Sequence, residues 1–117
     1  MEIHMHTDTN IAGGEKLSGQ VQTEIENALA RFADRITRIE VHLSDESAGR
    51  VTSRDRRCVL EARVAGGQPV AVTNNANTID EALRGAVAKL VRLLETRFAR
   101  HSDPKGGATI RIGEQAS

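Results

Sequence analysis

The chain has 117 residues, and its 16 basic and 16 acidic side chains give a formal net charge of zero. This length accommodates one hydrophobic core and leaves no room for a second independent domain. With 38% apolar and 27% charged residues, the composition is typical of a folded globular protein and excludes a disordered or membrane-embedded class.

Features that would direct a chain out of the cytoplasm are not expected here. The longest apolar-leaning run is interrupted by Arg84, Lys89 and Arg92, so we predict no membrane-spanning helix. The first ten residues do not place basic residues ahead of an apolar stretch, which argues against a secretory signal. Cys58 is the single cysteine, and a chain without an intramolecular disulfide suits a reducing compartment. We therefore predict a cytoplasmic protein.

The first half of the chain reads as strand, helix, strand. Residues 1–6 alternate apolar and polar side chains, which predicts a strand with one buried face. From about residue 15 to 34, apolar side chains recur three and four apart, as in an amphipathic helix. The alternation returns in residues 39–43 and predicts a second strand, followed by a polar loop over residues 45–53.

The second half reads as two strands and a helix. A third strand is predicted over about residues 55–64, and Gly66 to Gln68 form a hairpin turn before a short fourth strand that begins at Pro69 and includes Val72. Thr78 and Glu81 have the spacing of a capping box ahead of a helix over residues 79–99.

The resulting order is βαβββα. It predicts an α+β fold in which two helices cover one face of a four-stranded, mainly antiparallel sheet while the other face meets water. We expect one domain over residues 1–101 and a flexible tail over residues 102–117.

Positive charge collects toward the C-terminal end of this neutral chain. Between Arg84 and Arg111 there are seven basic residues and only two acidic ones. On the last helix, four of the bases fall on the side away from the apolar stripe: Arg84, Lys89, Arg92 and Arg100. This pattern is common on solvated helices, but so little internal pairing favours a surface that binds phosphate.

Aromatic content limits the kind of nucleic acid that such a surface would bind. The chain has two Phe residues, Phe32 and Phe98, and no Tyr or Trp; both lie on apolar stripes, so we predict that they belong to the core. Proteins that bind single strands stack bases on exposed aromatic rings. We therefore expect contacts to the backbone and shape of a folded RNA.

Other chemistry has weaker support. His4, His6, Glu40 and His42 share the polar side of two strands that could be neighbours, so a metal site or a small metalloenzyme is an alternative. No accompanying cysteine or HExxH spacing supports it, and we predict neither a metal nor any other cofactor. Cys58 shares the parity of apolar neighbours and is predicted to be a buried, inert thiol. No pair of nucleophile and base is recognisable, so we expect neither catalysis nor a small-molecule substrate.

Three segments carry a resemblance to a known family: RIEVHLSDES, RDRRCVLEARVAGGQPVAVT and TIDEALRGAVAKLVRLLETRF. Together with the βαβββα order, they resemble the ribosome hibernation-promoting factor and ribosome-associated inhibitor A family, also called sigma-54 modulation proteins, over about residues 1–100. The resemblance implies a fold like double-stranded RNA-binding domains, and binding to small-subunit ribosomal RNA near the decoding channel. It also implies that the protein idles ribosomes under stress or in stationary phase. The chain resembles the short form, without the C-terminal dimerisation domain of long members.

The resemblance also implies particular RNA-binding residues. The basic positions of the family's KLxR segment fall on Lys89 and Arg92, Arg84 and Arg100 extend the same surface, and Arg35 and Arg38 are further candidates. The neutral net charge leaves open an alternative, a protein-binding regulator of transcription or of a stress complex without RNA contact.

Overall fold

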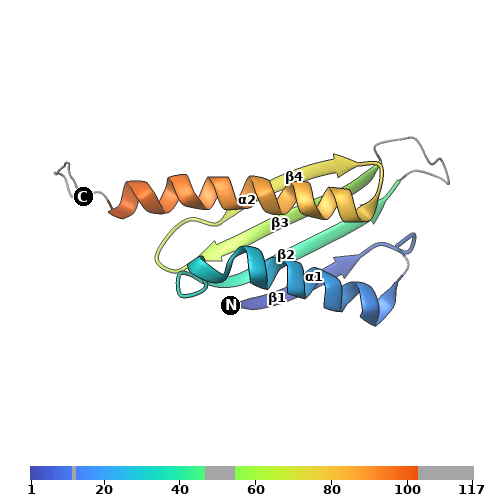
Figure 1. Cartoon of the computed structure of the whole chain (residues 1–117), viewed down its shortest axis with the longest axis horizontal. Coiled ribbons are helices and arrows are strands. Elements are labelled where there is room, and N and C mark those ends of the chain that lie inside the picture. Colours follow the sequence, from blue (N-terminus) through green and yellow to red (C-terminus); the bar gives the residue numbers. More distant parts are fainter. Residues whose placement is uncertain (12, 47–54, 103–117) are drawn as a thin grey trace.

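The computed structural model describes residues 1–11, 13–46 and 55–102, with side chains through Ala99. Its elements, in chain order, are β1 (Glu2–Thr7), α1 (Gly14–Ala28), the 3-10 turn η1 (Ala30–Phe32), β2 (Ile36–Asp45), β3 (Arg56–Val64), β4 (Val70–Ala76) and α2 (Ile79–Ser102) (Figure 1). The predicted βαβββα order is confirmed. No helix in this described part of the chain is both long and apolar enough to cross a bilayer.

The four strands form one sheet in the order β1-β2-β3-β4. β1 and β2 are parallel, because the chain crosses over through α1 between them, and the other two pairings are antiparallel. The register aligns Val41 with Met5 on one side and with Leu60 on the other. Apolar side chains therefore line up across the same face of the sheet.

Both helices cover this apolar face. In Figure 1, α1 runs in front of β1 and β2, and α2 runs in front of β3 and β4. Fully buried side chains come from every layer, among them Ile25, Leu29, Ile39, Leu60, Leu90 and Leu94. The rings of Phe32 and Phe98 pack against each other with their centroids 5.5 Å apart, and both are buried. The prediction that the aromatic residues belong to the core is confirmed.

The first helix ends earlier than predicted. α1 stops at Ala28 instead of continuing to about Asp34, and Leu29 leaves the helical conformation with φ −107° and ψ 13°. The tighter turn η1 follows, in which the amide of Phe32 donates to the carbonyl of Leu29. The turn directs Phe32 into the core and reverses the chain into β2, which a continued α-helix would not do.

The other boundaries differ by a few residues. α2 begins at Ile79 as predicted, because the Thr78 hydroxyl accepts a hydrogen bond from the Glu81 amide at 3.1 Å, and it continues to Ser102. β2 and β4 are both longer than predicted. β4 reaches Ala76, and the Asn74 side chain donates to carbonyl oxygens at the start of α2, which anchors this polar end of the strand. The predicted tail after residue 102 and most of the predicted loop at 45–53 lie outside the described residues.

Candidate nucleic-acid interface

Three basic side chains lie on the part of α2 that the sheet leaves uncovered or that borders β4. Arg92 is exposed. Lys89 lies beside β4, where its Nζ donates to the carbonyl of Thr73 at 2.8 Å. Farther along, Nη2 of Arg97 donates to the carbonyl of Gln68 at 2.8 Å. We call Lys89, Arg92 and Arg97 the basic face.

Few acidic residues lie near the basic face in the described part of the chain. Residues 64–79, which form the hairpin and β4 beside it, include no charged residue at all. Between Lys89 and Arg97 the helix has one acid, Glu95, and its carboxylate pairs with Arg31 of η1. Within the described residues no carboxylate forms an ion pair with any member of the basic face. Their positive charges therefore remain available to an external anion.

Arg35 lies at the far end of the basic face. Its guanidinium stacks over the Phe98 ring at 4.1 Å from the centroid, and its carbonyl accepts a hydrogen bond from the Ala65 amide. Arg35 and Arg97 both line a small cavity beside Gly66 and Gly67 of the hairpin. A planar guanidinium offers paired donors that match the oxygens of a phosphate, and stacking on a ring fixes its orientation.

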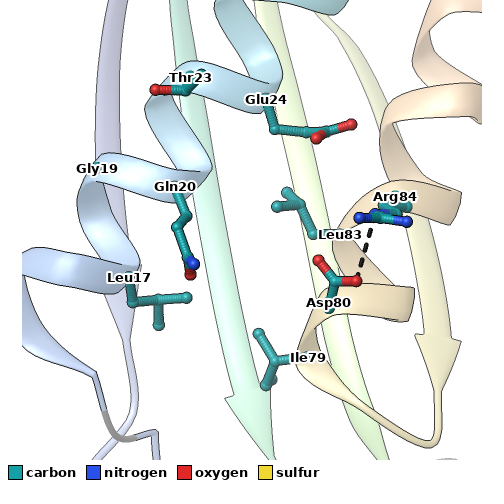
Figure 2. A pocket seen from close by; sticks show the side chains of 9 residues that line it. All are labelled: Leu17, Gly19, Gln20, Thr23, Glu24, Ile79, Asp80, Leu83 and Arg84. Carbon is teal, nitrogen blue, oxygen red and sulfur yellow. Dashed lines mark ion pairs between the residues drawn. The ribbon is translucent and has the colours of Figure 1, made fainter.

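Arg84 and Arg38 have other environments. Arg84 pairs with Asp80 at 3.3 Å, one helical turn earlier, and lines a groove of about 590 Å3 between α1 and α2. Figure 2 shows this pair on the α2 side of the groove, opposite Gln20 and Thr23 of α1. Arg38 lies on β2 on the uncovered side of the sheet, with Nε 3.0 Å from Oε2 of Glu40. Thus the sequence-predicted residues do not form a single surface.

Two further basic residues of α2 remain: Arg100, which was predicted, and Arg97, which was not. Arg100 lies in α2, but its side chain is outside the described residues. Arg97 was not predicted, although it follows Lys89 by eight residues and so lies about 80° around the helix from it. Its proximity to the hairpin depends on how β4 packs on α2, which the helical period alone does not reveal.

The cysteine offers no reactive group on this surface. The side chain of Cys58 is fully buried, and burial raises the pKa of its thiol to about 12. A thiol with so high a pKa remains protonated at neutral pH and is a poor nucleophile. The histidine constellation lies on the uncovered side of the sheet, away from the two helices.

Comparison with known proteins gives one family and a set of similar folds. Residues 4–102 match the sequence model of the family described as sigma 54 modulation protein / S30EA ribosomal protein. The fold is similar to a ribosomal subunit interface protein from Coxiella burnetii, with a TM-score of 0.64 and 14% identity over 85% of this chain and 99% of that one. It is also similar to the N-terminal domain of Thermus thermophilus Protein Y, with a TM-score of 0.65 and 20% identity over 84% of this chain and 99% of the other. No curated protein sequence matches significantly.

Proposed function

The chain belongs to the sigma 54 modulation protein / S30EA ribosomal protein family, and from this membership we propose that it is a cytoplasmic, ribosome-associated regulator of translation. In this proposal it binds ribosomal RNA of the small subunit near the decoding channel and idles ribosomes under stress or in stationary phase. It acts by occupying the path of messenger and transfer RNA and makes or breaks no bond. The name of the Coxiella protein, a subunit interface protein, supports the choice of partner.

The observation that carries this proposal is the basic face, since within the described residues none of its members forms an ion pair and the nearby Glu95 pairs with Arg31. Lys89, Arg92 and Arg97 contact the phosphates, and Arg35 extends the contact at the hairpin end. Arg100 is one helical turn beyond Arg97 and continues along the same helix. Because both phenylalanines are buried and the chain has no Tyr or Trp, the contacts are to phosphates and shape.

A protein partner without RNA contact is the second candidate, and the groove between the helices favours it. The floor of the groove is apolar, with Leu17, Ile79 and Leu83, while its rim includes the acidic side chains of Glu24 and Asp80 (Figure 2). Arg84 neutralises Asp80 on this rim, and a groove with an apolar floor and a mainly polar rim suits a peptide or an amphipathic helix.

Sedimentation with isolated ribosomal subunits tests the proposal. The purified chain is mixed separately with small and large subunits and centrifuged through a sucrose gradient. We expect it to migrate with the small subunit. When transfer RNA and messenger RNA are bound to the subunit first, the chain should no longer bind. Migration at the top of the gradient in both mixtures would contradict the proposal and favour the protein partner.

A further inference from the structure

The uncovered face of the sheet holds a group of metal-binding side chains from two neighbouring strands. The parallel register places His6 beside His42, and Glu40 precedes His42 by two residues on β2. Residues two apart on a strand, and residues paired across strands, point to the same face. One potential ligand atom from each of His6, Glu40 and His42 lies within 4.8 Å of the other two.

These three side chains are close to the geometry of a coordination site. Nε2 of His6 lies 2.6 Å from Oε1 of Glu40, and the rings of His6 and His42 stack with centroids 4.7 Å apart and planes 14° from parallel. In a tetrahedral zinc site with bonds of about 2.0 Å, ligand atoms are roughly 3.3 Å apart. Coordination would require the His6 and Glu40 atoms to separate slightly from their 2.6 Å contact.

Two charged side chains flank the three potential ligands. Oε1 of Glu61, on β3, lies 3.5 Å from Nε2 of His42 and is placed to orient that ring. Arg38 competes with a metal for Glu40, which limits the affinity of the site.

We propose that His6, Glu40 and His42 form a binding site for a divalent transition-metal ion, with Zn2+ as the ion that best matches two imidazoles and one carboxylate. The set leaves a fourth position for water or for a ligand from outside the chain. The site is on the opposite side of the sheet from the helices and does not depend on ribosome binding. The sequence grouped these residues with His4 on two possibly neighbouring strands but predicted no metal, because no cysteine or HExxH spacing accompanies them; the register of β1 against β2 brings the three together.

Zinc titration of the complete chain tests the site. The protein is prepared without a polyhistidine tag, stripped with a chelator and titrated with Zn2+ in competition with a chromophoric chelator. We expect saturable binding of one ion per chain. His6→Asn and His42→Asn should each weaken binding at least about tenfold, because each removes one of three ligands. His4→Asn is the matched control: His4 lies on the same strand and face, but its Nε2 pairs with Glu2 at 3.1 Å.

Thermal unfolding with and without Zn2+ provides a second measurement. Zn2+ should raise the melting temperature of the wild type and of His4→Asn and should leave that of His6→Asn unchanged. If either histidine variant fails to fold, Glu40→Gln serves as a second test. It keeps the size of the side chain and should also abolish the increase in melting temperature. Non-saturable uptake, or equal affinity in the wild type and in all ligand variants, would overturn the proposal.

Discussion

The buried thiol of Cys58 makes the stability of the fold depend on alkaline pH. Its pKa is raised from an ordinary value of 9.0 to about 12, so the folded chain holds this proton over a range in which the unfolded chain releases it. The stabilisation is fully present below pH 9 and is lost as the pH rises through 12. At pH 10 an exposed thiol is about ten times more often ionised than protonated. The free energy of unfolding should therefore be about 1.4 kcal/mol lower at pH 10 than at neutral pH.

Urea unfolding at pH 7, 8, 9 and 10, followed by circular dichroism in the presence of a reductant, measures this loss. Cys58→Ala is the control, because it creates a cavity whose cost is the same at every pH but has no thiol to ionise. The unfolding free energy of the wild type should fall by about 1.4 kcal/mol more than that of the variant between pH 7 and pH 10. Parallel curves for the two proteins would refute the burial argument, and rapid reaction of the folded thiol with a disulfide reagent at pH 7 would do the same.

Two further predictions concern α2. Thr78→Ala removes the hydroxyl that accepts from the Glu81 amide and should lower the unfolding free energy by about 1 kcal/mol, whereas Thr78→Ser should restore most of it; equal stability of both variants would show that the cap contributes nothing. Arg97→Gln and Arg84→Gln remove the same charge from the same helix. If only the basic face contacts RNA, Arg97→Gln should weaken binding to the small subunit roughly fivefold, about 1 kcal/mol. Arg84→Gln should leave the affinity unchanged within experimental error, because Arg84 is paired with Asp80 beside α1. The opposite ranking would place the RNA on the groove.

The order of elements was predictable because local patterns determine it. The alternation in β1 and β2 and the apolar stripe of α2 have the periods of a strand and a helix, and the cap at Thr78 marks where α2 begins. The end of α1 was not predictable in this way. The helical pattern continues through Phe32, whereas the tighter turn packs Phe32 against Phe98, a contact between distant parts of the chain that no local pattern reveals.

The candidate sites depend on packing between elements, so the sequence predicted them only partly. The helical period placed Lys89 and Arg92 away from the apolar stripe, and both side chains are exposed on α2. Arg84 satisfies the same period but pairs with Asp80, and Arg97 became a candidate only once β4 and its hairpin were placed beside α2. The sequence also grouped the histidines with Glu40, but the distances between them depend on the register of β1 against β2, which no pattern within either strand determines.

The central claim, that the basic face binds the small ribosomal subunit, is tested most directly by reversing its charge. Lys89→Glu with Arg92→Glu is compared with Arg57→Glu with Arg63→Glu, a control with the same charge change on exposed residues of β3, on the uncovered side of the sheet. The melting temperature of the Lys89/Arg92 variant should stay near that of the wild type, because both side chains are exposed and the hydrogen bond of Lys89 to the sheet is at the surface.

Affinity for purified small subunits is then measured at several salt concentrations. The Lys89/Arg92 variant should bind at least about tenfold more weakly than the wild type, a loss of about 1.4 kcal/mol, and the slope of log affinity against log salt should flatten by roughly 1 to 2 units. The Arg57/Arg63 control variant should lose less affinity for the small subunit than the Lys89/Arg92 variant. A folded Lys89/Arg92 variant with unchanged affinity and unchanged salt slope would contradict the account.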